Sequence, residues 1–352
     1  MKQERKSDMQ ATEALPGRIA DTEALEEILS RPDIILQREL QSLDGDIMVL
    51  GVGGKMGPSL AHMAKRAAPD KRVIGVARFS EAGLREQLEG WGIETIQCDL
   101  TDRKALEALP KAKNIVFMAG MKFGAGGDQP RTWAMNTYLP GLVAETFTDS
   151  RIVAFSTGCV YPFVGIDEIG ATEQTPLNPP GEYANSCVGR ERLFQYFSAQ
   201  HGTPGRLIRL NYAIDLRYGV LHDLAVKIRD GKPVDLTTGH VNVIWQGDSN
   251  RYSLRALAHA TAPTTPINVS GPETLSVKWL ATELAQRLGK PVSFTGEPAK
   301  TAWLNNAAEV MRLFGYPLVS IKVMLDWVAE WVAGNGQSLN KPTKFENRDG
   351  EY

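Results

Sequence analysis

Cysteine is scarce in this chain of 352 residues, and neither sign of charge is in clear excess. The three cysteines, Cys98, Cys159 and Cys187, are scattered and form no C-x-x-C pair. An odd number of cysteines without a secretory signal favours reduced thiols, and this spacing does not match a zinc site. The formal net charge of -2 provides no basic surface for nucleic acid. We therefore expect no disulfide, no metal site and no nucleic-acid partner.

Long apolar stretches are also missing. The N-terminal stretch MKQERKSDMQATEALPG is charged and lacks the apolar centre of a signal peptide. No later stretch approaches the roughly 18 apolar residues that span a bilayer. We therefore expect a cytoplasmic protein without a membrane segment. With 43% hydrophobic and 23% charged residues the composition is that of an ordinary globular protein, and the length suits one large core or two domains.

What the sequence does contain is a series of short apolar runs separated by amphipathic segments. The runs are IMVLGV (47–52), RVIGVA (72–77), IETIQC (93–98), NIVFMAG (114–120), RIVAFS (151–156) and RLIRLN (206–211). A helical stretch follows each of the first five. Strands that are apolar on both faces and alternate with helices belong to a parallel sheet covered on two sides. The pattern predicts an α/β fold, a Rossmann-like doubly wound parallel sheet with a smaller C-terminal substrate lobe.

The same patterns divide the chain into four segments. Residues 1–44 are predicted to be a helical extension, and residues 45–211 the Rossmann domain, which is expected to be NAD(P)-binding because of the glycine-rich loop described next. Residues 212–334 should form mainly the substrate-binding lobe, with strands at 241–245 and 267–271 and helices at 275–288, 306–314 and 321–333. A strand or helix near 241–260 could return to the Rossmann domain. Residues 335–352 are expected to be a polar surface tail.

A glycine-rich loop directly follows the first predicted strand. Gly51, Gly54 and Gly57 are spaced G-x-x-G-x-x-G in GVGGKMG, a helix begins at the end of the loop, and Lys55 and Met56 lie within it. The first glycine permits a tight turn, the second lets backbone approach a pyrophosphate, and the third lets the helix pack on the strand. The helix N-terminus then faces the anion. The loop therefore predicts a dinucleotide-binding site.

The end of the second strand bears on which dinucleotide is bound. An acid at this place bonds the ribose 2′-hydroxyl of NAD, but this strand ends in Val76, Ala77 and Arg78. An arginine suits the 2′-phosphate of NADP, although a solvated arginine at a strand end is the alternative. We expect NADP as the cofactor, with NAD as the alternative.

Further landmarks follow the glycine loop along the chain: CDLTD (98–102), FMAGMKFG (117–124), STGCVYP (156–162), GEYANSCVGRERLF (181–194) and WQGDSNRYSLRAL (245–257). With these landmarks in order, the chain from Asp46 to about Trp331 resembles the extended short-chain dehydrogenases/reductases, the NAD(P)-dependent epimerase/dehydratase family that acts mostly on nucleotide sugars. FMAGMKFG resembles a cofactor loop of UDP-glucose 4-epimerases. The resemblance implies cofactor contacts from Asp99, Leu100, Ala119, Gly120, Lys122, Ser156 and Tyr183, and a structural role for Asn136.

The resemblance also implies the catalytic residues. Thr157 matches the catalytic hydroxyl at the strand end, Tyr183 the catalytic tyrosine, and Asn211 a substrate-contacting asparagine. The helix of Tyr183 matches the family's Y-x-x-x-K helix, but Cys187 stands where the family has lysine. Thr157 would also contact the substrate, so the predicted catalytic set is Thr157, Tyr183 and Cys187.

The missing lysine matters because a tyrosine with an ordinary pKa near 10 is a poor base at pH 7. In the family the lysine charge favours the phenolate and holds the nicotinamide ribose; a neutral Cys187 thiol can do neither. Lys122 and Arg190 are the candidate replacement cations, since Arg190 returns to the face of Tyr183 two helical turns on. The alternative is a solvated Arg190 that pairs with neighbouring acids.

The strand-end motif narrows the expected reaction. Sugar 4,6-dehydratases of the family place an acid pair after the threonine, where this chain has Gly158 and Cys159. We therefore expect an epimerase or oxidoreductase that acts on a sugar or nucleotide sugar through hydride transfer and a keto intermediate. The alternative is a catalytically silent NAD(P)-binding sensor or scaffold.

The family further implies a homodimer built from the helices at 130–148 and 182–200. Their apolar faces supply the candidate contacts: Leu142, Val143, Phe147, Leu193, Phe194 and Phe197. Burial within one subunit would also explain these side chains.

Overall fold

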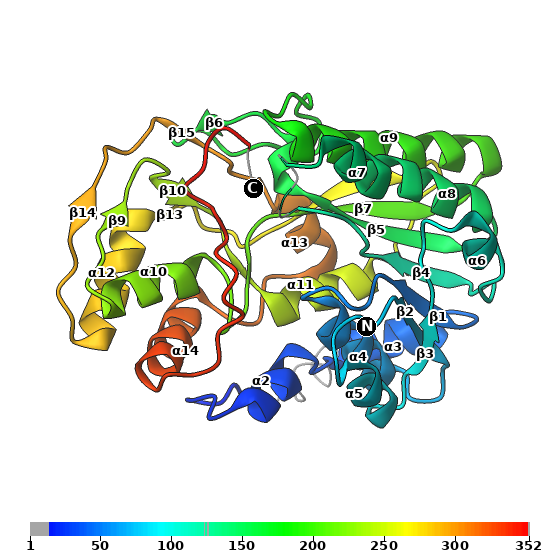
Figure 1. Cartoon of the computed structure of the whole chain (residues 1–352), viewed down its shortest axis with the longest axis horizontal. Coiled ribbons are helices and arrows are strands. Elements are labelled where there is room, and N and C mark those ends of the chain that lie inside the picture. Colours follow the sequence, from blue (N-terminus) through cyan, green and yellow to red (C-terminus); the bar gives the residue numbers. More distant parts are fainter. Residues whose placement is uncertain (1–13, 123, 125–126, 351–352) are drawn as a thin grey trace, which may run out of the picture.

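Seven parallel strands form the central sheet of the protein (Figure 1). The computed structural model describes residues 14–122, 124 and 127–350. The strands are β1 (Ile47–Leu50), β2 (Val73–Ala77), β3 (Glu94–Gln97), β4 (Asn114–Phe117), β5 (Arg151–Thr157), β7 (Gly205–Leu210) and β12 (Thr265–Val269), in the order β12-β7-β5-β4-β1-β2-β3. Because β1 lies between β2 and β4, the strand order reverses there, and a crevice opens at the carboxyl ends of the strands. The predicted doubly wound sheet is confirmed.

Alternate residues of each strand face two helical layers. Ile47 and Val49 of β1 pack on one layer, and Met48 and Leu50 on the other. The first layer holds α3 (Ile34–Ser42), α4 (Gly57–Ala67), α5 (Leu84–Gly90), α11 (Gln246–Arg255) and α13 (Ala308–Phe314). The second holds α6 (Arg103–Glu107), α7 (Gln129–Trp133), the π-helical turn η2 (Ala134–Tyr138), α8 (Leu139–Thr146) and α9 (Glu182–His201). The strands therefore read as continuous apolar runs.

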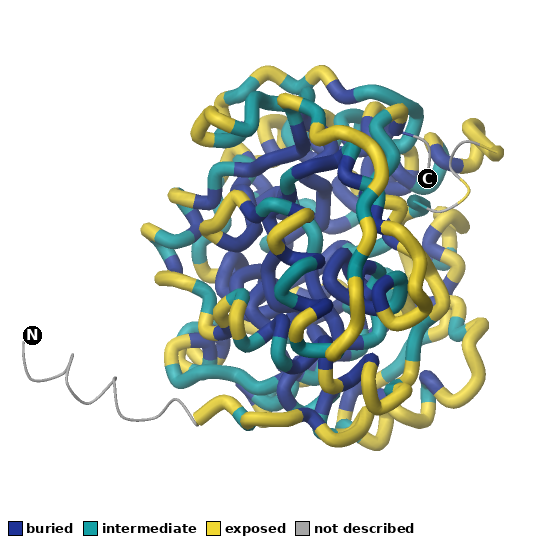
Figure 2. The backbone as a smooth tube through the Cα atoms, turned by 90° about the vertical axis from the view of Figure 1, so that its left-hand side faces the viewer, coloured by how far each residue is buried: buried dark blue, intermediate teal, exposed yellow. Residues whose placement is uncertain are grey.

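A second apolar core forms a smaller C-terminal lobe. It is built from α10 (Val220–Arg229), α12 (Val277–Leu288) and α14 (Ile321–Ala333), and α2 (Thr22–Leu29) of the N-terminal extension joins it. The short strands are β6 (Val164–Gly165), β8 (Ala213–Ile214), β9 (Val234–Asp235), β10 (His240–Val241), β11 (Ile244–Trp245), β13 (Leu275–Ser276), β14 (Phe294–Thr295) and β15 (Thr301–Ala302), and η3 (Gly158–Val160) is a 3-10 turn. Figure 2 shows the buried segments gathered in the interior of the molecule.

Part of the chain after residue 211 returns from the lobe to the Rossmann domain, as the prediction for residues 241–260 allowed. Helix α11 packs on α3 and α4. The run at 267–271 was assigned to the lobe, but β12 instead pairs with β7 at the edge of the large sheet. The helices predicted at 275–288, 306–314 and 321–333 are confirmed as α12, α13 and α14.

The two end segments pack on the folded chain. Leu25 and Leu29 of α2 and Leu36 and Leu40 of α3 are inaccessible to solvent, while residues 1–13 lie outside the described part. The surface-tail prediction is wrong for part of the C-terminus, because Thr343 and Phe345 are only 2% exposed. We call residues 337–350 the C-terminal strap; it is drawn in red in Figure 1 as it passes α10, and residues 351–352 are not described. No described helix is both long and apolar enough to cross a membrane.

Candidate active site

The glycine loop joins β1 to α4 and leaves one backbone face open. Gly51 has φ of 88°, and a Cβ there would lie 2.6 Å from the backbone nitrogen of Ala119. A Cβ on Gly57 would lie 2.2 Å from the carbonyl oxygen of Val52, so α4 packs directly on the loop. A Cβ on Gly54 would meet only the carbonyl oxygen of Gly51, at 3.6 Å. Open backbone before the N-terminus of α4 fits the pyrophosphate of a dinucleotide.

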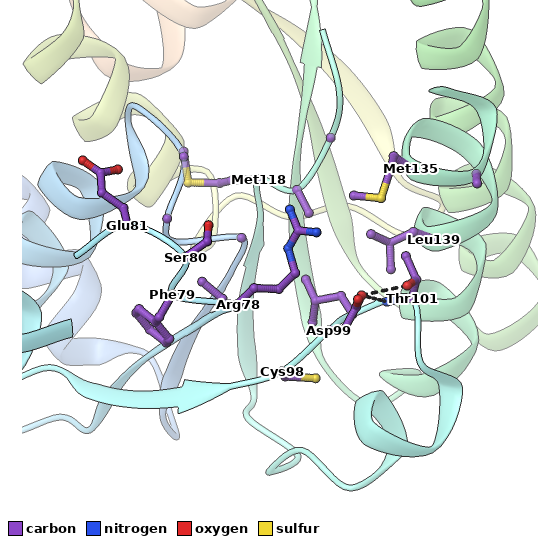
Figure 3. Close-up of a pocket in the computed structure, with 18 of the residues that line it drawn as sticks. Arg78, Phe79, Ser80, Glu81, Cys98, Asp99, Thr101, Met118, Met135 and Leu139 are labelled. Atoms are coloured by element: carbon purple, nitrogen blue, oxygen red, sulfur yellow. Dashed lines mark hydrogen bonds between the residues drawn. The ribbon is translucent and has the colours of Figure 1, made fainter. Parts of the chain in front are cut away.

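A cavity of about 560 Å³ lies beside this loop at the strand ends (Figure 3). We call it the strand-end cavity. Figure 3 shows the guanidinium of Arg78 extending into it from the end of β2, beside Asp99. Hydrogen bonds from the side chain and backbone of Thr101, with smaller effects of Arg78 and Arg131, hold the pKa of Asp99 below its ordinary value. The predicted cofactor residues that line the cavity are Gly51, Gly54, Arg78, Asp99, Leu100, Ala119 and Gly120.

The sequence interpretation missed other residues of this cavity. Ser80 and Glu81 follow Arg78 directly, so extending the strand-end motif by a few residues would have found them. Arg131 and Tyr138 come from α7 and η2, far along the chain, and no motif marks them. Two cations, Arg78 and Arg131, therefore line the cavity together with one acid from the segment after β2, Glu81.

A second cavity, of about 270 Å³, continues from the first, because Gly54 and Met118 line both. We call it the tyrosine cavity. The predicted site residues that line it are Gly54, Lys55, Met56, Gly57, Lys122, Ser156, Thr157, Tyr183 and Asn211. Residues from the glycine loop, from β5, from α9 and from the segment after β7 thus come together here. The fold explains this, since all of them lie at the carboxyl-end crevice of the sheet.

Tyr183 lies on the first turn of α9 and meets the end of β5. Its hydroxyl is hydrogen-bonded with the side chain of Thr157 and with the thiol of Cys187. Burial raises the pKa of Tyr183 well above its ordinary value, the nearby thiols add to this, and Arg190 and the bond with Thr157 oppose it. The Tyr183 side chain is therefore held in its protonated form.

Cys187 is completely buried and contacts Tyr183, but it does not line the cavity. Burial raises the pKa of its thiol, so Cys187 is neutral at ordinary pH and brings no charge to the site. This agrees with the expected consequence of losing the lysine.

Arg190 is buried, so the alternative of a solvated arginine paired with acids is wrong. Its side chain is 6% exposed, and Nη1 donates to the carbonyl oxygen of Phe155 at 2.6 Å. Nη2 donates to Oδ1 of Asn136 at 2.8 Å, and a Cβ on Gly120 would lie 2.5 Å from Nη2. The guanidinium is thus held behind the cofactor loop, and its charge lowers the pKa of both Tyr183 and Cys187.

Asn136 holds the loop that carries Lys122. Its side chain accepts from the backbone nitrogen of Met121 at 2.8 Å and donates to the Met121 carbonyl at 2.8 Å. The Lys122 ammonium then lies 6.0 Å from the centre of the Tyr183 ring. The predicted structural role of Asn136 therefore has a geometric basis; Phe123, within the same motif, lies outside the described residues.

Two other predicted residues are tied into the surrounding structure. Ser156 donates its hydroxyl to the buried carboxylate of Glu191 at 2.6 Å, and Glu191 pairs with Arg209 at 2.7 Å. Asn211 directly follows β7 and donates to the carbonyl oxygen of Trp303 at 3.1 Å. Ser156 and Asn211 line the tyrosine cavity, but part of their hydrogen-bonding capacity is already used.

Comparison with known proteins places this geometry in a family. The family model described as "NAD dependent epimerase/dehydratase family" matches residues 47–240, more than half of the chain. A dTDP-glucose 4,6-dehydratase of Mycobacterium tuberculosis is 28% identical over 169 residues, 44% of this chain and 50% of that protein. The chain thus spans about half the length of the curated relatives it matches.

Solved structures resemble nearly the whole fold. UDP-glucuronic acid 4-epimerase from Bacillus cereus, in complex with NAD, gives a TM-score of 0.68 at 18% identity, covering 82% of this chain and 99% of that one. dTDP-glucose 4,6-dehydratase from Bacillus anthracis, also with NAD, gives 0.70 at 16% identity, covering 83% and 97%. At these identities the likeness establishes the fold.

Proposed function

Because the chain belongs to the NAD-dependent epimerase/dehydratase family, we propose that it is an NAD(P)-dependent epimerase or oxidoreductase of a sugar or nucleotide sugar. One observation carries the proposal. The hydrogen-bonded hydroxyls of Tyr183 and Thr157 line a cavity that is continuous with the open glycine loop. A proton-transferring pair beside a dinucleotide site is what hydride transfer at a sugar carbon requires.

In this proposal the nicotinamide supplies the hydride acceptor and donor. Tyr183 takes the proton from the sugar hydroxyl as the keto intermediate forms, and returns it when the carbonyl is reduced. Thr157 bonds the reacting oxygen and orients it toward Tyr183. Asn211 contacts the substrate from the carboxyl end of the neighbouring strand β7. The backbone of the loop from Gly51 to Gly57 would hold the pyrophosphate of the cofactor, and Ala119 and Gly120 would lie along the cofactor.

The positive charge that the family obtains from its helix lysine comes here from two other cations, Arg190 and Lys122. Arg190 lowers the pKa of Tyr183 from behind the cofactor loop, and the Lys122 ammonium lies 6.0 Å from the centre of the Tyr183 ring on the cavity side. Both are cationic groups that favour the phenolate. Cys187 serves only as a neutral neighbour of the Tyr183 hydroxyl.

Epimerisation or simple redox chemistry is favoured over dehydration. Eliminating water needs a separate acid and base near the reacting carbon. Gly158 and Cys159 occupy the relevant positions, and no aspartate or glutamate lines the tyrosine cavity within the described residues.

NADP is the preferred cofactor in this proposal. Arg78 reaches into the strand-end cavity and Arg131 adds a second cation there. Glu81 is the acid that would serve the ribose hydroxyl of NAD, the alternative cofactor.

We also propose a cytoplasmic homodimer, though not through the faces first expected. Four of those side chains, Leu142, Val143, Phe147 and Phe194, are at most 3% exposed within one chain. The exposed aromatics within the same two ranges are Trp133, 39% exposed, Tyr138, 55% exposed, and Tyr196, 57% exposed, so the contact would form there. Sedimentation of a monomer alone at micromolar concentration would contradict the dimer.

The test of the function is the Tyr183→Phe variant. It removes only the transferable proton, so turnover should fall by at least about a thousandfold while NADP affinity changes by less than about twofold. Tyr316→Phe, at a tyrosine that is 71% exposed and lines neither cavity, is the matched control and should behave as wild type. If the wild type binds NADP but turns over no sugar or sugar nucleotide, the protein is the silent sensor or scaffold.

A further inference from the structure

The C-terminal strap covers the tyrosine cavity on its lobe side. Thr343 lines the cavity, and the carboxylate of Asp223 on α10 accepts from its backbone nitrogen at 2.8 Å and from its hydroxyl at 2.6 Å. The neighbouring Phe345 is buried in the lobe core. The strap is therefore part of the cavity wall.

The strap is anchored on both sides of this point. Its Leu339 backbone nitrogen donates to the carbonyl oxygen of Arg217 at 3.0 Å, and Glu346 pairs with Lys227 of α10. Arg348 donates to the hydroxyl and carbonyl oxygens of Thr301, both at 2.8 Å. The strap thus runs from the lobe to the start of α9, where Gly350 lies against Gly181, and it forms one wall of the space beside the reacting groups.

The tyrosine cavity is small. Ligand sites for molecules of drug size are typically 300–1,000 Å³, and the tyrosine cavity of about 270 Å³ must also admit the nicotinamide end of the cofactor. The remaining room suits one sugar ring. On the lobe side this room ends at Thr343 of the strap.

The charge of the cavity wall is one-sided. Lys55 and Lys122 line it, and within the described residues no carboxylate does. Nζ of Lys55 donates to the carbonyl oxygen of Ala213 at 3.3 Å and lies 4.3 Å from the centre of the Tyr218 ring. No salt bridge to Lys55 occurs in the part of the chain that the structure describes. An ammonium has three N–H donors. Among the described residues, the contacts of the Lys55 ammonium are one carbonyl oxygen and one ring face, which are fewer than its donors.

The acids nearest to Lys55 are already engaged. Asp215 is bound by Arg217, whose Nη2 lies 2.7 Å from Oδ2, and Asp223 accepts the hydrogen bonds of Thr343. Burial lowers the pKa of Lys55 to about 8, with Asp215 opposing and the charges of Arg217 and Lys122 adding to the lowering. An anion in the cavity would restore the favourable environment that burial removes.

We propose that the tyrosine cavity binds a monosaccharide bearing a carboxylate or phosphate and no nucleotide, with the anion at Lys55 and the strap closed over it. This substrate class rests on the proposed sugar redox function. It departs from the sugar nucleotides named for the similar structures. The side chain of Lys55 lines the tyrosine cavity and not the strand-end cavity, which separates it from the cofactor's adenosine.

Calorimetric titration of the NADP-saturated full chain tests this with four probes: glucuronate, glucose 6-phosphate, glucose and UDP-glucuronate. At least one anionic monosaccharide should bind more than about tenfold tighter than glucose, a difference that one charge-assisted contact supplies. UDP-glucuronate should bind at least about tenfold weaker than that sugar. The two anionic probes distinguish a carboxylate from a phosphate ligand. Tighter binding of UDP-glucuronate, or no preference for the anions over glucose, would overturn the proposal.

Lys55→Met should remove the preference for the anionic sugar and leave NADP affinity within about threefold. Lys55→Arg, which keeps the charge, should retain it, and Lys104→Met on exposed α6 is the control. If Lys55→Met weakens NADP binding and leaves the sugar preference intact, Lys55 serves the cofactor phosphates and the assignment is wrong. These readouts report binding, so they stand apart from failure of the redox function, which would appear as absent turnover with the binding preference preserved.

Discussion

The two cavities of the cleft are assembled in different ways. The strand-end cavity is lined entirely by residues between Gly51 and Leu139, whereas the tyrosine cavity draws on residues from Gly54 to Thr343. The first depends on local turns and strand ends. The second depends on how α9, the segment after β7 and the C-terminal strap pack together. The comparison suggests that cofactor binding is a local property of this chain and substrate binding a property of its whole tertiary structure.

Removal of the buried guanidinium of Arg190 should have the largest effect on stability, and it should disturb the tyrosine cavity. In Arg190→Met the carbonyl of Phe155 and the side chain of Asn136 lose their donor, so the free energy of unfolding should fall by roughly 3 kcal/mol. Urea denaturation measures this. The control Arg192→Met, exposed on the same helix, should change it by less than about 0.5 kcal/mol. Equal stability of the two variants would mean that Arg190 is not the support described here.

A methyl group added to the glycine loop should disturb the strand-end cavity instead. In Gly57→Ala the new methyl group meets the Val52 carbonyl oxygen at 2.2 Å, so α4 must shift, at about 1–3 kcal/mol of stability. NADP affinity should fall with it. Gly90→Ala, where no atom lies within 4 Å of the added carbon, is the matched control. An unchanged NADP affinity in Gly57→Ala would separate the loop from cofactor binding.

Cofactor preference should depend on Arg78. A charge-assisted contact contributes about 1.5–3 kcal/mol, so NADP should bind about ten- to a hundredfold more tightly than NAD, and Arg78→Ala should erase the difference. Arg103→Ala, at the surface and paired with Glu145, is the control. Titration that finds NAD bound as tightly as NADP by the wild type would reject the assignment.

The smallest effect is expected at Cys187. Since its neutral thiol supplies no charge, Cys187→Ala should keep turnover within about threefold of wild type. Cys187→Lys should move the alkaline rise in rate to lower pH, because a cation beside Tyr183 favours the phenolate. A large loss of turnover in Cys187→Ala, with the fold intact by circular dichroism, would show that the thiol takes part in the chemistry.

The sequence allowed most of the sheet and the strand-end cavity to be predicted. A glycine loop between a strand and a helix, and a residue such as Arg78 at a strand end, take their meaning from a few neighbours. The environments of Arg190 and Thr343 could not be predicted in this way. Surfaces distant in sequence decide whether Arg190 on its helix is solvated or buried under Gly120. They also decide whether the polar C-terminal segment is free or anchored to α10.

The orientation of Lys55 shows the same limit. Its place in the glycine loop predicts a cofactor contact, yet the side chain turns toward Ala213, 158 residues later in the chain. The pattern of the loop specifies its backbone, while the direction of this side chain follows from the packing of the lobe.

The most direct test of the central claim, that Tyr183 is the acid and base although Cys187 replaces the lysine one helical turn on, is the pH dependence of sugar oxidation by the wild type. The raised pKa of Tyr183 keeps the phenol protonated at neutral pH, and only the phenolate accepts a proton. The oxidation rate should therefore rise about tenfold per pH unit through pH 10 without levelling off near neutrality, and Tyr183→Phe should remove the rise. A wild-type rate that is flat from about pH 6 to 10 and unaffected by Tyr183→Phe would contradict the claim.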